Sequence, residues 1–191
     1  MADFPAGSEG MVYAFSCNRR DFLKLCGFLA VGSGFPMLIA RACKPEGVGN
    51  EVTADMFIAG GGLGGCAAAL AATRRGFRVV MAEPTDWIGG QATQQGVSAL
   101  DDHPWIESFG RTRSYAEFRT RIRDYYRKHY PLTPETMACR YFNPGDCLVS
   151  KLCFEPKVAL AVLQEMLAPA VRDGLLVLLP NTTPTKRRCG S

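Results

Sequence analysis

The spacing of apolar residues predicts a strand, a helix and a second strand in the first half of the chain. Residues 55–59 and 77–82 are short apolar runs, which are typical of buried strands in a parallel sheet. Residues 64–75 between them are rich in alanine, which favours a thin helix, and Gly76 follows as its C-terminal stop. This order predicts an α/β fold with a parallel sheet.

The second half of the chain predicts two longer helices and a third strand. Apolar residues recur at helical spacing through residues 115–130, and Ser114 and Glu117 are placed as a capping box. Residues 156–173 predict a helix buried on more than one side, and residues 175–179 predict a buried strand. The first of these helices has a basic face that we expect to be exposed to solvent rather than to bind a partner: Arg119, Arg121, Arg123, Arg127 and Lys128.

The junction between the first strand and its helix carries a dinucleotide-binding pattern. Gly60, Gly62 and Gly65 have the G-x-G-x-x-G spacing, which serves a tight turn, a close approach to a pyrophosphate and close packing of helix on strand. The backbone N–H groups at the start of the helix, including those of Leu63 and Gly64, would face the phosphates. Glu83 follows the second strand, near the spacing of about 20 residues expected for a ribose-binding carboxylate. A glycine-rich turn in an unrelated α/β fold is the alternative.

Composition agrees with a globular protein and argues against a nucleic-acid partner. The 191 residues are 47% hydrophobic and 21% charged, which indicates neither disorder nor a protein with several membrane spans. The net charge of +4 comes from the two ends, because residues 43–185 contain equal numbers of acidic and basic side chains. This balance gives little support to a nucleic-acid partner, whose phosphate backbone would require an excess of basic side chains.

Residues 1–42 resemble a twin-arginine export signal. Arg19 and Arg20 precede Asp21-Phe22-Leu23-Lys24 and an apolar run over 25–40, with Asn18 where serine or threonine is more usual. The run is short for a membrane-spanning helix, and Ala40-Arg41-Ala42 provides a cleavage pattern before Cys43. The resemblance implies the twin-arginine translocation machinery as a partner and a periplasmic or extracellular location. An uncleaved membrane anchor and a lipid-modified Cys43 are the alternatives. Residues 43–52 are predicted to form a linker.

A second glycine pair narrows the cofactor to FAD. Residues 84–91 (Pro-Thr-Asp-Trp-Ile-Gly-Gly-Gln) and 96–101 resemble the exported bacterial FAD-dependent oxidoreductases, which have a glutathione-reductase-like FAD-binding fold. The resemblance covers about residues 55–179. It implies that Pro84, Gly89, Gly90 and Gln91 lie along FAD, that residues 91–98 lead toward the flavin ring, and that the strand at 175–179 lies beside the two nucleotide-binding strands.

The prediction is therefore a Rossmann-type FAD-binding domain over residues 53–185, with a helical insertion at about 101–155 and a basic tail at 186–191. The expected activity is hydride transfer between flavin and an unknown small molecule. An NAD(P)-binding oxidoreductase and a non-catalytic exported module are the alternatives. The chain stops before the substrate domain and the late flavin-contacting segment of the family, so a truncated product is also expected.

No residue can be assigned as a catalytic base, and no ligand spacing predicts a metal. Asp101-Asp102-His103 is interpreted as a solvated loop, and His129 as exposed on a helix. Cys139, Cys147 and Cys153 could form one disulfide, which an oxidising destination permits, or remain buried thiols. No closely spaced cysteine pair follows the second glycine pair, as a redox-active disulfide in the reductase branch of this fold would require.

Overall fold

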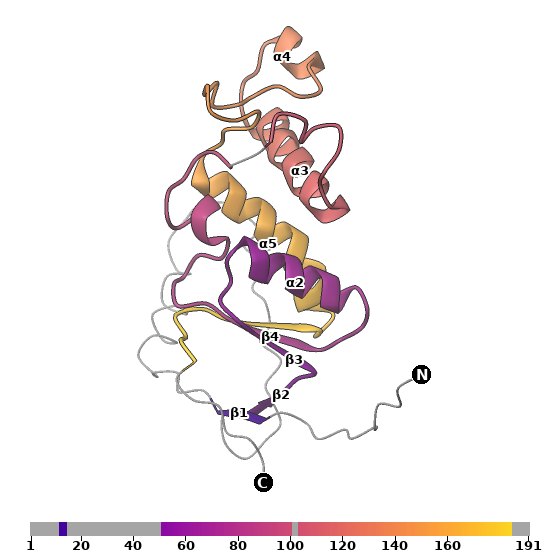
Figure 1. Cartoon of the computed structure of the whole chain (residues 1–191), viewed down its shortest axis with the longest axis vertical. Coiled ribbons are helices and arrows are strands. Elements are labelled where there is room, and N and C mark those ends of the chain that lie inside the picture. The colour runs from indigo at the N-terminus through magenta and orange to yellow at the C-terminus, as the bar shows by residue number, and fades with distance from the viewer. Residues whose placement is uncertain (1–11, 15–50, 101–102, 185–191) are drawn as a thin grey trace.

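A computed structural model describes residues 12–14, 51–100 and 103–184 of the chain. The elements in chain order are β1 (Val12–Ala14), β2 (Glu51–Thr53), β3 (Met56–Ala59), α2 (Leu63–Thr73), β4 (Val79–Ala82), the 3-10 helix η2 (Gly90–Ala92), α3 (Arg113–His129), α4 (Pro134–Ala138), α5 (Pro156–Arg172) and β5 (Leu176–Leu179). Strands and helices alternate around a small parallel sheet, so the predicted α/β class is confirmed (Figure 1).

The sheet has three strands in the order β3, β4, β5. Met56 pairs with Val79 in β4, and Val79 pairs in turn with Leu176 in β5, both in parallel register. All four residues of β4 are buried, because this strand lies between its neighbours and under the helices. Strand β5 therefore lies beside β4, the strand that precedes Glu83, rather than beside β3. The parallel ladders place the carboxyl ends of all three strands at one edge.

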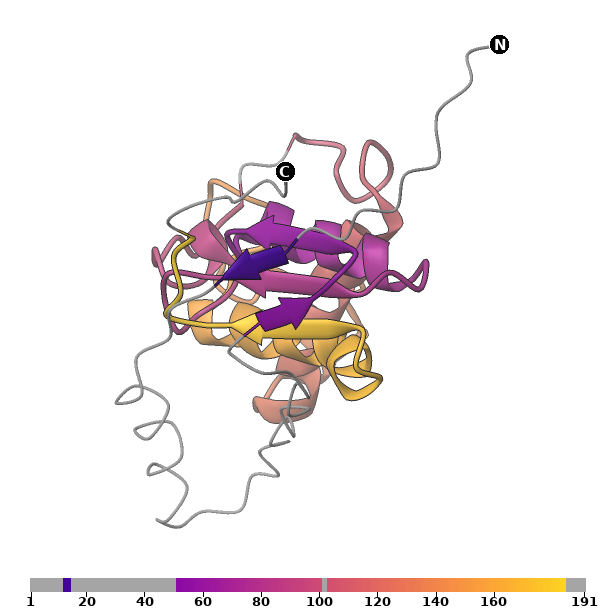
Figure 2. The same cartoon turned by 90° about the horizontal axis from the view of Figure 1, so that it is seen from below.

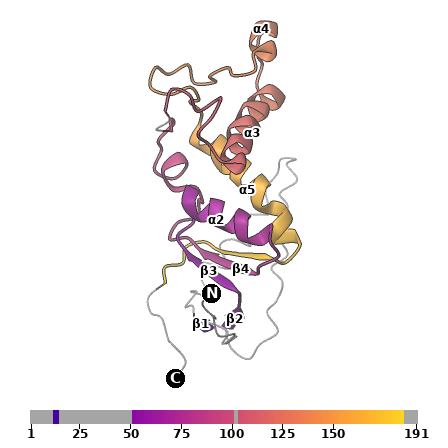
Figure 3. The same ribbon diagram turned by 45° about the vertical axis from the view of Figure 1, so that its right-hand side comes forward.

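Helices α2 and α5 cover one face of the sheet (Figures 1 and 3). Helix α3 packs on the side of α5 that is away from the sheet, and α4 lies beyond α3 at the far end of the molecule (Figure 3). The two-stranded antiparallel sheet of β1 and β2 lies on the opposite side of the three-stranded sheet (Figure 2). The core therefore forms mainly between the sheet and α2 and α5, and continues between α5 and α3.

The local predictions are largely confirmed, with one error in capping. Helix α3 ends at His129 before Pro131 and α5 begins at Pro156, both as predicted. Helix α3, however, is capped by Thr112, whose side-chain oxygen accepts a hydrogen bond from the Tyr115 N–H. The predicted capping box is wrong because the helix begins two residues earlier than a Ser114 cap would place it, which leaves Glu117 free to pair with arginines.

The prediction of a solvated basic face on α3 is wrong for two of its arginines. Arg119 and Arg123 are only 1% and 2% exposed. Glu107, from the loop before α3, lies 2.6 Å from Arg119 Nη2 and 2.5 Å from Arg123 Nη2. The Arg123 side chain also donates to the Phe142 carbonyl oxygen at 2.9 Å. Burial is possible because a shared carboxylate and backbone carbonyls replace the water that the two guanidinium groups lose.

The predicted export signal lies outside the described residues except for 12–14, and so do Asp101 and Asp102. Within the described part of the chain, no helix combines the length and the apolar character that crossing a bilayer requires. Residues 51–53 form a strand where the linker was predicted to end.

Candidate functional site

The glycine loop joins β3 to α2 at the carboxyl edge of the sheet. Gly60 has a φ of +105°, in the left-handed region that favours glycine, and its N–H donates to the Ala82 carbonyl oxygen at 2.8 Å. Gly62 then adopts an extended conformation as the N-cap of α2. The chain thus turns sharply out of the strand and presents the start of the helix at the sheet edge.

Gly62, Gly64 and Gly65 meet different surroundings. A Cβ atom at Gly65 would collide with the backbone carbonyl oxygen of Gly60, so this glycine lets α2 pack against the loop. A Cβ atom at Gly62 or at Gly64 would have no atom within 4 Å. Gly65 is therefore required by packing within the protein, whereas Gly62 and Gly64 border open space.

The start of α2 has no side-chain cap and no acidic residue in its own first turn. The N-cap Gly62 has no side chain to accept from the first turn, and that turn contains no acidic residue. The first N–H groups of a helix have no intrahelical acceptor, and the helix dipole places partial positive charge there. Leu63, Gly64 and Gly65 thus present backbone donors beside the open space at Gly62, an arrangement that suits a phosphate group.

Glu83 holds the glycine loop against the end of β4. Its side chain is buried, with Oε2 accepting from the Gly61 N–H at 2.8 Å and Oε1 accepting from the Thr85 N–H at 3.0 Å. The Thr85 hydroxyl also lies 2.8 Å from Oε1. A carboxylate has about four lone-pair positions, so three protein donors leave capacity for one more donor.

The second glycine pair packs directly against the first glycine loop. The Gly89 N–H donates to the Gly61 carbonyl oxygen at 2.7 Å, and Gly62 and Gly89 form a parallel bridge. Gly89 has a φ of +109°, and a Cβ atom there would lie 2.5 Å from Thr93 Cγ2 and 2.7 Å from Leu163 Cδ1. Two glycine segments that are distant in sequence therefore form one surface. Pro84 and Gln91 are exposed near it.

Sequence reasoning missed three residues that organise this site. The Cys66 thiol is buried and donates to the Gly61 carbonyl oxygen at 3.3 Å; burial, followed by the Glu83 charge, raises its pKa to about 12. Thr85 binds Glu83 as described above, and the Thr93 hydroxyl donates to the Ile88 carbonyl oxygen at 2.7 Å. The cysteine and the threonines carried no recognisable motif, since Cys66 and Thr93 bond to backbone carbonyl oxygens and Thr85 bonds to a side chain that was assigned to another role.

The histidines and candidate cysteines to which the sequence analysis gave no catalytic or metal-binding role are not part of this glycine-loop site. His103 and His129 are exposed, in agreement with their interpretation as solvated side chains. Within residues 51–100 and 103–184, no group of three or more His, Cys, Asp or Glu side chains is arranged to hold a metal ion. Cys147 and Cys153 form a disulfide, while Cys139 is a free, exposed thiol.

Comparison with known proteins gives one family match. The model of the family described as FAD dependent oxidoreductase matches residues 55–188, which include both glycine segments and Glu83. A search among curated proteins found no match.

Proposed function

The chain belongs to the FAD-dependent oxidoreductase family, whose cofactor is FAD, and on this basis we propose that its two glycine segments and Glu83 bind the ADP half of FAD. The observation that carries the proposal is the meeting of the two segments, in which the Gly89 N–H bonds to Gly61 and the Gly61 N–H bonds to Glu83. One surface then contains open space at Gly62 and Gly64, helix donors and a carboxylate.

In this assignment each residue has a distinct task. The N–H groups of Leu63, Gly64 and Gly65 bind the pyrophosphate, and the absence of a side chain at Gly62 allows the phosphates to approach the backbone. The remaining lone pair of Glu83 accepts from a ribose hydroxyl, while its other hydrogen bonds keep it in place. Gly89, Gly90 and Gln91 continue the surface away from the ribose.

Bound FAD supplies hydride transfer, and the protein supplies binding, orientation and exclusion of water. Among the described residues near the glycine surface, Cys66 is kept as a neutral thiol by its raised pKa, so it contributes a hydrogen bond rather than a nucleophile. The substrate side of the reaction is not assigned to any residue of this surface.

The test is the cofactor content and affinity of the purified chain. We expect stoichiometric flavin absorbance, and we expect Glu83→Gln to weaken FAD binding by an amount on the order of 1.5–3 kcal/mol, as for a lost hydrogen bond to a charged group. Glu165→Gln is the matched control, because this carboxylate is exposed on α5 and pairs with Arg121. Circular dichroism shows whether each variant is folded.

Three outcomes would contradict parts of this assignment. Unchanged FAD affinity in a folded Glu83→Gln protein would remove Glu83 from the ribose role. Tight binding of a nicotinamide dinucleotide with no flavin retained would favour the NAD(P) alternative. Flavin that is bound and is reduced by dithionite, but by no organic donor, would favour a non-catalytic module.

We also propose that residues 1–42 direct export by the twin-arginine route, which delivers folded proteins with their cofactor. The arginine pair at 19 and 20 supports this, and so does the Cys147–Cys153 disulfide, because disulfides persist in oxidising compartments. Changing Arg19 and Arg20 to lysine should retain the product in the cytoplasm in a fractionation experiment. Arg41→Lys is the matched control, and unchanged export of the double variant would refute the proposal.

A further inference from the structure

A large pocket lies away from the glycine surface, between the C-terminal half of α3 and the loop that precedes α5. Its volume is about 1030 Å³, which suits a drug-sized molecule. Residues 97–99 and 142–156 form much of its wall, and Tyr126 and Tyr130 contribute to it from α3. Nothing in the proposed binding of the ADP half of FAD uses this pocket.

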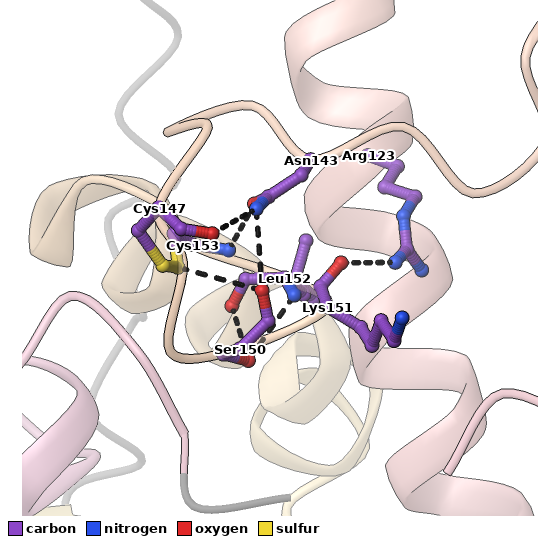
Figure 4. Close-up of a disulfide and its surroundings, with 7 residues drawn as sticks. All are labelled: Arg123, Asn143, Cys147, Ser150, Lys151, Leu152 and Cys153. Carbon is purple, nitrogen blue, oxygen red and sulfur yellow. Dashed lines mark hydrogen bonds between the residues drawn. A yellow bond between two sulfur atoms is a disulfide. The ribbon is translucent and has the colours of Figure 1, made fainter. Parts of the chain in front are cut away.

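The wall is held in one shape by a disulfide and by the side chain of Asn143 (Figure 4). Cys147 and Cys153 close a short loop, and Asn143 Nδ2 donates to the Cys147 and Ser150 carbonyl oxygens at 3.1 and 3.2 Å. Asn143 Oδ1 accepts from the Cys153 N–H at 2.6 Å. The loop nevertheless leaves Val149 80% exposed at the pocket. A fixed loop that presents an apolar side chain suits an apolar ligand.

Aromatic rings form the side of the pocket that faces α3. The rings of Tyr126 and Tyr130 are 4.6 Å apart, and Phe142 and Phe154, both buried, also line the pocket. Aromatic side chains at a pocket wall favour edge-to-face or offset contact with another aromatic ring, at centroid distances of about 4.5–7 Å. The shape and chemistry of this wall therefore favour a planar or aromatic ligand.

The charges at the pocket disfavour anionic ligands. The charged residues that line it are Asp146 and Glu155, and no lining residue is basic. Glu155 is already matched, because its Oε2 lies 2.7 Å from Lys157 Nζ and its Oε1 accepts from the Tyr130 hydroxyl at 2.7 Å. An anion would meet these carboxylates with no basic side chain in the lining, so a neutral ligand fits the pocket better than an acid.

Tyr126 lines the pocket and has a hydroxyl group that can donate a hydrogen bond. Tyr126 is 5% exposed, and its oxygen accepts from the Glu155 N–H at 2.8 Å. No described residue accepts the hydroxyl proton itself. Burial, above all, raises the pKa of Tyr126, so the proton stays on the oxygen at neutral pH. The hydroxyl proton is therefore available to an acceptor in the pocket, and a ligand carbonyl oxygen can take it.

We propose that this pocket binds a neutral aromatic carbonyl compound whose oxygen accepts the hydrogen bond of Tyr126. This binding function goes beyond the proposed FAD site, and it does not depend on flavin being bound. Tyr126 selects the carbonyl, the aromatic rings hold the body of the ligand, and the two carboxylates exclude acids.

Three matched probes test the ligand class by isothermal titration calorimetry on the full chain. Benzophenone carries the carbonyl, diphenylmethane lacks it, and benzoylbenzoate adds a negative charge. We expect benzophenone to bind about fivefold more tightly than diphenylmethane, as for one neutral hydrogen bond, and more tightly than benzoylbenzoate. Equal affinity for benzophenone and diphenylmethane, or binding of the acid as tight as that of the ketone, would overturn the proposal.

A pair of tyrosine variants tests the residue. In Tyr126→Phe the preference for benzophenone over diphenylmethane should disappear, whereas in Tyr125→Phe, the neighbouring tyrosine outside the pocket lining, it should persist. A loss of structure would weaken both probes equally, so the ratio isolates the hydrogen bond. Photoactivated benzophenone should attach within residues 97–99 or 126–156, and attachment elsewhere would overturn the proposed location. Repeating the titration after removal of flavin separates this result from the test of the FAD site.

Discussion

Replacing Gly65 with alanine should destabilise the protein even when no cofactor is present. The added methyl group would collide with the backbone carbonyl oxygen of Gly60, which is fixed because the Gly60 N–H bonds to Ala82 in β4. Neither the carbonyl nor the start of α2 can rotate away as a flexible side chain could. We expect a loss of about 1–3 kcal/mol in the free energy of unfolding, the usual cost of overpacking a close contact.

Gly62→Ala should give the opposite result. An alanine there meets no protein atom within 4 Å, and the extended backbone of Gly62 is open to any residue. The free energy of unfolding of the cofactor-free chain should therefore change by no more than about 0.5 kcal/mol. FAD affinity should fall by about 1.5–3 kcal/mol, because the methyl group keeps the phosphates from one charge-assisted backbone hydrogen bond.

Urea unfolding of the cofactor-free proteins and equilibrium dialysis against FAD measure the two effects separately. Gly64→Ala is an informative control, since it also faces open space but lies within the helix, where alanine is favoured over glycine. The reasoning fails if Gly62→Ala lowers the stability of the cofactor-free chain as much as Gly65→Ala does. It also fails if Gly62→Ala binds FAD as tightly as the unmodified protein.

Three further predictions concern charges and cysteines. Glu107→Gln should cost about 3–5 kcal/mol of stability in urea unfolding, because two buried arginines lose their shared carboxylate, and a change within 1 kcal/mol would contradict this. Burial alone would raise the pKa of Glu107, but its two arginine partners outweigh burial and hold that pKa below the ordinary 4.5. The contribution of Glu107 to stability is therefore complete above pH 4.5 and is lost as the pH falls through the lowered pKa. Acid should thus destabilise the unmodified protein more than the Glu107→Gln variant. Changing Cys147 and Cys153 together to alanine should lower the free energy of unfolding by about 2 kcal/mol, because the disulfide closes a loop between cysteines 6 positions apart in the sequence. Urea unfolding with the same midpoint and the same slope for both proteins would contradict this value. Iodoacetamide at pH 8 should label the exposed Cys139 and spare Cys66, whose pKa is raised to about 12, and mass spectrometry showing equal labelling would contradict the burial of Cys66.

The elements that sequence reasoning predicted correctly are those with strong local signals. The strand–helix–strand order around Gly60–Gly65 follows from apolar spacing and glycine placement, and α5 follows from Pro156 and the helical period after it. Each of these signals lies within one element, so no knowledge of distant contacts was needed.

The features that were missed depend on partners far away in the sequence. Arg119 was expected in solvent because its helix face is basic, but it is buried against Glu107 in the preceding loop. The disulfide could not be assigned between three candidate cysteines, since the choice depends on how Asn143 folds the loop that contains two of them. Glu83 was predicted to face a ribose. Its hydrogen bond to the Gly61 N–H was not predicted, because it depends on the pairing of β3 with β4.

The position of β4 between its two neighbours has a consequence for the order of folding. Glu83 receives the Gly61 N–H on one side, while its own N–H donates to Leu179 of β5 and its carbonyl oxygen accepts from Thr182. The strand that completes this arrangement is made long after the glycine loop, because the α3, α4 and α5 segments come between them. Contacts between such distant segments form slowly, since a long loop must close first. The nascent chain should therefore acquire a competent cofactor site only after β5 has left the ribosome, so cofactor capture is a late step of biosynthesis.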